Sequence, residues 1–168
     1  MRDLGDIGSA PNVGAAINDR GQVTGYVSVP GAYPDRLAFL YTQGRLRVID
    51  ARPAGVERYS EGAGINNAGH AVGDSNHLFG WVYRGRRMQS LTALVDPAGG
   101  WTIQAPRAIN DAGQIAATGT RNGQQYAVRL DPLRPSLEAP PPVEQDADAA
   151  PEPVTPTAPA PEAAAPAQ

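Results

Sequence analysis

Short runs in which apolar and polar residues alternate recur along residues 1–133, and glycine or proline interrupts them about every ten residues. No useful length of chain shows the spacing of an amphipathic helix. A typical run, Ala-Phe-Leu-Tyr at residues 38–41, leads through a polar turn into residues 45–49. A second, at residues 80–83, leads through Arg-Gly into residues 86–91. The pattern therefore predicts β-hairpins and an all-β fold.

One motif, Ile-Asn-(Asp/Asn)-x-Gly, occurs three times, at residues 17–21, 65–69 and 109–113, with the copies 48 and 44 residues apart. Such self-similarity at a near-constant spacing is the signature of a repeat fold. The asparagine can accept a backbone hydrogen bond, and the glycine can adopt the positive φ that ends a type I turn with a glycine bulge. The motif predicts a tight turn between antiparallel strands, with structural residues Asn18, Gly21, Asn66, Gly69, Asn110 and Gly113.

A second hairpin follows each turn, so we expect three antiparallel repeat units of four strands each. Units of this length with four strands fit the blades of a β-propeller. The third unit lacks a fourth strand, because Asp131 and Pro132 directly follow residues 127–130. We expect the N-terminal strand, residues 1–7, to complete this last unit and close a propeller-like ring. Three blades are fewer than usual, so a small prism, assembly with another chain and a piece of a longer array are all open alternatives.

Three strings follow one another in the first unit. Residues 3–8 read Asp-Leu-Gly-Asp-Ile-Gly, residues 16–25 contain the turn motif, and residues 38–41 read Ala-Phe-Leu-Tyr. This succession resembles the unit of the bacterial extracellular HAF-repeat family, although Leu37 stands at the position of the family's histidine. The resemblance covers residues 2–130. It implies a secreted or cell-surface β-repeat protein without established catalytic activity, and it carries no catalytic residues to transfer.

The composition divides the chain at residue 133. All 19 glycines lie between Gly5 and Gly123, whereas 11 of the 17 prolines lie from Pro132 onward. Residues 134–168 hold one arginine, six carboxylates and no aromatic residue, a composition that favours an extended, solvated segment over a packed one. We expect a β-repeat domain at residues 1–133 and a disordered, acidic Pro/Ala-rich tail at 134–168. A ligand for a proline-reading domain is the less favoured role for this tail.

The residue types also limit the chemistry. The chain has no cysteine, which excludes disulfides, a cysteine nucleophile and a thiolate metal site. It has neither a Gly-x-Ser-x-Gly elbow nor a complete phosphate-binding loop. His70 takes the place of Gln22 and Gln114 in the other units, and its spacing from His77 and Asp74 does not indicate a shared metal site. The turns carry too few carboxylates for a calcium loop, so we expect no metal and no cofactor.

Partners are constrained in the same way. No apolar run is long enough to span a bilayer, and no signal peptide is readable in the chain as written. Residues 1–133 hold 13 arginines against 11 carboxylates, a balance that argues against nucleic-acid binding. Phe39 and Trp81 hold equivalent positions and are expected in the core rather than in a sugar-stacking surface. Binding residues most often lie on loops, and the candidate contact residues there are Tyr33, His77 and Trp101.

These observations favour a non-catalytic extracellular or surface module that binds an unknown protein or carbohydrate, with self-association as a further possibility. The competing hypothesis is a hydrolase on a propeller scaffold, such as a glycosidase, which needs paired carboxylates facing one cleft. Glu57 and Glu61 are close in sequence, but their polar connection favours solvation. A truncated fragment of a longer repeat protein is the third hypothesis.

Overall fold

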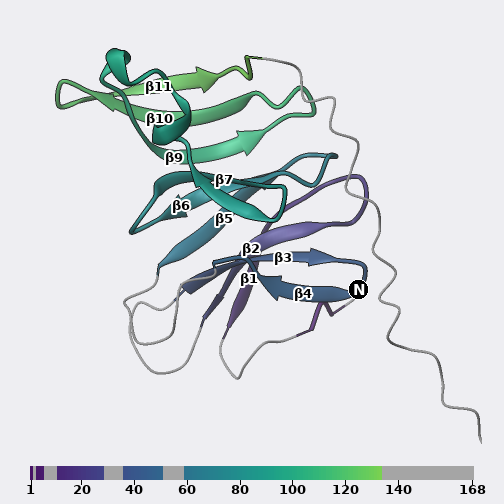
Figure 1. Cartoon of the computed structure of the whole chain (residues 1–168). Coiled ribbons are helices and arrows are strands. Elements are labelled where there is room, and N and C mark those ends of the chain that lie inside the picture. Colours follow the sequence, from purple (N-terminus) through teal and green to yellow (C-terminus); the bar gives the residue numbers. More distant parts are fainter. Residues whose placement is uncertain (2, 6–10, 29–35, 51–58, 134–168) are drawn as a thin grey trace, which may run out of the picture.

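The computed structural model describes residues 1, 3–5, 11–28, 36–50 and 59–133, which form an all-β structure (Figure 1). Sheet 1 contains β1 (Asn12–Ile17), β2 (Val23–Ser28), β3 (Arg36–Thr42) and β4 (Arg45–Val48). Sheet 2 contains β5 (Ser60–Ile65), β6 (Ala71–Ser75), β7 (Phe79–Arg84) and β8 (Arg87–Ser90). Two short 3-10 helices, η1 (Thr92–Leu94) and η2 (Pro97–Gly99), follow it. Sheet 3 contains β9 (Thr102–Ile109), β10 (Ile115–Arg121) and β11 (Gln124–Leu130).

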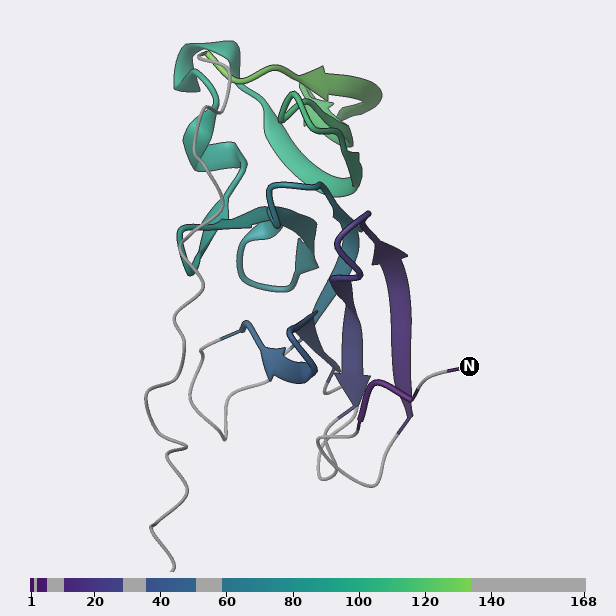
Figure 2. The same ribbon diagram turned by 90° about the vertical axis from the view of Figure 1, so that its right-hand side faces the viewer.

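Each sheet is an antiparallel meander in which every strand pairs with its neighbour in sequence. The sheets stack with their first strands together, since β5 contacts β1 on one side and β9 on the other. Sheet 2 lies between sheets 1 and 3, which form the two ends of the stack (Figures 1 and 2). The described residues therefore form an open array of three units.

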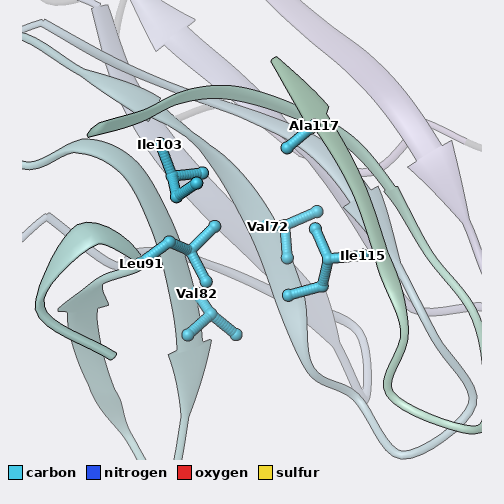
Figure 3. Packing of buried hydrophobic residues seen from close by; sticks show 6 residues of the cluster. All are labelled: Val72, Val82, Leu91, Ile103, Ile115 and Ala117. Atoms are coloured by element: carbon cyan, nitrogen blue, oxygen red, sulfur yellow. The ribbon is translucent and has the colours of Figure 1, made fainter. Parts of the chain in front are cut away.

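Apolar cores fill the spaces between the sheets. Trp81 is fully buried between sheets 1 and 2, together with Ala38 and Ile65. The core between sheets 2 and 3 is drawn in Figure 3 and contains Val72, Val82, Leu91, Ile103, Ile115 and Ala117. The adjacent β6 residues Ala71 and Val72 enter different cores. Sheet 2 is apolar on both faces because a sheet covers each of them.

The first strand of each unit carries an irregularity in its pairing, and a glycine faces it in sheets 1 and 2. A Cβ added to Gly25 would overlap the carbonyl oxygen of Val13, and one added to Gly73 would overlap that of Glu61. A bulge brings the backbone of the first strand against the second strand at these positions. This approach explains the glycine that stands four positions after the turn glycine in the first two units, where the third unit has Ala117.

Two predictions about the ends of the domain are wrong. Sheet 3 has three strands rather than four, and the N-terminal segment does not complete it, because Leu4 packs against the core of sheet 1. The three sheets therefore do not close into a ring, and Ile7 lies outside the described residues.

The position of Leu4 has a simple physical explanation. Ile49 and Leu91 each follow the last strand of a unit, and each donates its amide to the third strand at 2.9 Å. Their side chains enter the core that the unit shares with the next sheet. Leu4 likewise packs on the core of the sheet that follows it in sequence. Burial against this nearby sheet needs only a short connection, whereas sheet 3 lies at the far end of the stack (Figure 1).

Candidate functional site

The three repeat turns share one geometry. In each turn the glycine amide donates to the asparagine carbonyl oxygen at 2.9–3.0 Å, and the glycine has a φ of 70–79°. The asparagine Oδ1 accepts the backbone amide four residues later at 2.9 Å. The asparagine and glycine of the three turns are Asn18 and Gly21, Asn66 and Gly69, and Asn110 and Gly113. A positive φ costs glycine little, and the asparagine side-chain oxygen satisfies the backbone amide that follows the turn glycine.

The turns also bind one another across the sheets, which the sequence analysis did not predict. The Nδ2 of Asn18 donates to the Asn66 carbonyl oxygen at 2.8 Å, and the Nδ2 of Asn66 donates to the Asn110 carbonyl oxygen at 3.1 Å. The backbone amide of Asp19 donates to Oδ1 of Asn67 at 2.9 Å. We call this set of contacts between the three turns the turn ladder.

Asn67 joins the first and third turns of the turn ladder. Its own backbone amide donates to Oδ1 of Asp111 at 2.7 Å. Its Nδ2 donates to the carboxylates of Asp19 and Asp111, at 2.7 and 2.9 Å. A neutral amide thus separates two carboxylates that would otherwise repel each other. These bonds satisfy the turn side chains within the chain, so the turns hold the units in register.

Replacing Asn66 with alanine is expected to lower the free energy of unfolding by about 2–3 kcal/mol, because it removes the bond to the Asn110 carbonyl oxygen and the acceptor of the partly buried His70 backbone amide. Asn110→Ala removes two exposed bonds to Gln114 within its own turn, and is expected to cost about 1 kcal/mol, because it breaks no side-chain bond to another unit. Urea denaturation monitored by circular dichroism measures both. An equal or larger cost for Asn110→Ala would contradict the ladder.

A charged cluster lies where β5 and β6 meet sheet 1. Glu61 of β5 pairs across the sheet with Asp74 of β6. Arg36 of β3 donates to the Glu61 carboxylate at 2.5 Å, and its guanidinium lies 4.6 Å from the centre of the Tyr26 ring. Glu61 therefore lies in a strand and forms an ion pair, contrary to the solvated connection that the sequence indicated. Glu57 lies outside the described residues.

Burial and crowding of like charges perturb two groups of this cluster. Burial, followed by the neighbouring Asp74 and Glu61 carboxylates, raises the pKa of the Tyr59 hydroxyl to about 12. Burial, followed by Glu61, also raises the pKa of Asp74, whereas Arg107 and a hydrogen bond with Tyr59 oppose this effect. The protonated forms of both groups are thus favoured by the fold.

Tyr59 gives a prediction about alkaline pH. The unfolded chain has the ordinary tyrosine pKa of about 10, so the folded chain retains the proton to higher pH. The stability that Tyr59 contributes is complete below about pH 10 and is lost as pH rises toward about 12. Ultraviolet titration of the folded chain and of Tyr59→Phe should differ by one late-titrating tyrosine. If Tyr59 titrates in the original chain at the ordinary tyrosine pKa, the burial of its hydroxyl is refuted.

The candidate contact residues lie on different units. His77 is exposed in the turn between β6 and β7, and Trp101 is half-buried directly before β9. The Trp101 ring contacts Tyr126 edge-on, with 5.4 Å between ring centres, and the Arg121 guanidinium lies 5.6 Å from its centre. Trp101 therefore packs on sheet 3. Tyr33 lies outside the described residues.

Phe79, two residues after His77, was missed by the sequence analysis. Its side chain is 53% exposed and its φ is 55°, a conformation that non-glycine residues adopt only at a cost. Its apolar neighbours in β7, Trp81 and Val82, are both buried, one in each of the cores beside sheet 2. Nothing in the local pattern marks Phe79 as exposed, because the turn conformation that orients it depends on the hairpin.

Other chemistry is limited in the described part of the chain. These residues bring together no three His, Asp or Glu side chains that could hold a metal ion. No helix among them has the length and apolar character needed to cross a membrane. No family model, curated protein or solved structure matches this chain.

Proposed function

We propose that this chain is a non-catalytic β-repeat module of the HAF type that acts outside the cell or at its surface. It binds a protein or a carbohydrate. The repeated motif and the stack of three similar sheets support the repeat assignment. The turn ladder supports a structural role for the motif, because its polar side chains bind each other. The extracellular location rests on the family resemblance.

One observation carries the binding proposal. Phe79 begins β7 directly after the β6–β7 turn, two residues beyond the exposed His77; it is exposed, and its backbone has a strained, left-handed conformation. Exposed aromatic side chains on turns stack on sugar rings and fill pockets of protein partners. An apolar side chain that is held out at such a conformational cost is typical of a contact residue. We therefore assign the ligand contact to this turn.

Binding of the full chain to glycan and protein arrays tests the proposal. We expect at least one reproducible ligand, with binding lost in Phe79→Ser. The matched control is Leu94→Ser, which changes an exposed apolar residue of η1 that is 45% exposed. If Phe79→Ser and Leu94→Ser both bind the array ligands as well as the original chain does, the assignment to the β6–β7 turn is refuted.

A hydrolase remains the second candidate, because Glu61 and Asp74 are adjacent and the pKa of Asp74 is raised, as a general acid requires. The ion pair of Glu61 with Arg36 opposes this candidate, since it occupies the second carboxylate. Hydrolysis of chromogenic glycosides by the original chain, with loss in both Glu61→Gln and Asp74→Asn, would favour the enzyme. We expect no turnover in any of the three proteins.

A further inference from the structure

The turn ladder has a direction. At each junction the Nδ2 of the earlier asparagine and the backbone amide of the next residue donate to the later turn. One bond runs the other way, from the Nδ2 of Asn67 to the carboxylate of Asp19. At the sheet 3 end, the only bond of the Asn110 Nδ2 to another described residue lies within its own turn, to Gln114. At the sheet 1 end, the Asn18 carbonyl oxygen and the Asp19 carboxylate accept no bond from a preceding turn among the described residues. One end of the stack thus offers donors and the other offers the matching acceptors.

The sheet 1 end also exposes an apolar position that is buried or partly buried in the other two units. Ile65 is 8% exposed because sheet 1 covers it, and Ile109 is partly buried by sheet 2. Ile17 holds the same position in the first unit and is 69% exposed. Leu4 packs against the apolar cluster on this same face, so Ile17 marks its uncovered part, where a preceding sheet would pack.

The outer face of sheet 3 is the counterpart of this surface. Val72 of β6 is fully buried, and sheet 3 covers it, whereas Ala116, at the same position of β10, is exposed. Ala127 is exposed as well, although its equivalent Ala38 is fully buried. Small apolar residues let another backbone approach closely, as Gly64 of β5 does to the Cα of Ala108.

We infer that a second copy of this chain docks head to tail, with its sheet 1 end on the sheet 3 end of the first copy. Asn110 and the Asp111 amide then donate to Asn18 and Asp19 of the second copy, which continues the turn ladder. Ile17 of the second copy packs against Ala108 and Ala116. A heterologous contact of this kind forms a ring if its rotation closes and a linear array if it does not.

The contact between two copies differs in its charge from the contacts between the units of one chain. Asp111 of one copy meets Asp19 of the other, and no amide like that of Asn67 lies between the carboxylates. Their repulsion weakens the contact, and salt screens it. We therefore expect modest association that strengthens as the salt concentration rises.

Two single substitutions at exposed positions block one end each. Ile17→Asp alters the sheet 1 end, and Ala116→Arg alters the outer face of sheet 3. In sedimentation velocity over a concentration series, the full chain should associate, and each variant should associate at least about tenfold more weakly. Leu94→Asp, which changes an exposed residue of η1 in the connection between sheets 2 and 3, is the matched control and should associate like the original chain.

Mixing the two blocked variants distinguishes a head-to-tail contact from a symmetric one. Each variant retains one intact end, and these ends are complementary, so an equimolar mixture should form heterodimers although neither variant associates alone. A mixture that stays monomeric would overturn the inference. So would a full chain that remains monomeric at every concentration, or an Ile17→Asp variant that associates like the original.

Discussion

Replacing Trp81 with alanine is expected to lower the free energy of unfolding by about 3–5 kcal/mol, which is a large part of the stability of a domain of this size. Trp81 is fully buried and is the largest side chain in the core between sheets 1 and 2. Its loss leaves a cavity in the apolar core between these two sheets. Urea denaturation monitored by circular dichroism measures the change.

Trp81→Phe is the matched control for this prediction. Among the described residues, the Trp81 Nε1 has no hydrogen-bond partner. Phenylalanine therefore removes an unsatisfied buried donor while it keeps most of the apolar contact, and a cost below about 1.5 kcal/mol is expected. A Trp81→Phe variant as unstable as Trp81→Ala would show that the indole nitrogen is bonded and that this description of the core is wrong.

Replacing Gly73 with alanine is expected to cost about 3 kcal/mol, because the added methyl group cannot be accommodated. Its Cβ would overlap the Glu61 carbonyl oxygen and would lie 2.5 Å from Cζ2 of Trp81. The backbone at Gly73 has no positive φ, so the cost is steric. Thermal and urea denaturation of the variant measure it.

Gly14→Ala is the control for the steric argument. A Cβ at Gly14 meets only a Val23 methyl group, at 3.3 Å, which a small side-chain movement relieves. We expect a change within about 1 kcal/mol, since alanine also restricts the unfolded chain. If Gly73→Ala is as mild as Gly14→Ala, the bulged strand does not approach β6 as closely as described.

Local features of the sequence predicted local structure. The hairpins follow from alternating apolar residues, and the turns follow from asparagine and glycine at fixed positions, because both depend on interactions within a few residues. The turn ladder could not be derived in the same way. Its bonds join residues 44 or 48 positions apart, and they require the relative register of three sheets.

The errors arose where distant partners decide the outcome. Glu61 looks solvated in its sequence context, but its partner Arg36 lies 25 residues earlier on another sheet. Ring closure was inferred from a missing fourth strand, yet the burial of Leu4 against sheet 1 is the contact that forms. Phe79 was missed because a turn conformation, rather than the apolar pattern, exposes it.

The central claim is that three units stack openly through the turn ladder. Residue-resolved amide hydrogen exchange, in a dilute solution where the chain is monomeric, tests it most directly. The amides of Asp19 and Asn67 donate to the following turn and should be protected, whereas the Asp111 amide should exchange freely. Protection of all three amides in the monomer would contradict the account by indicating a closed ring, and free exchange of all three would indicate units that do not stack.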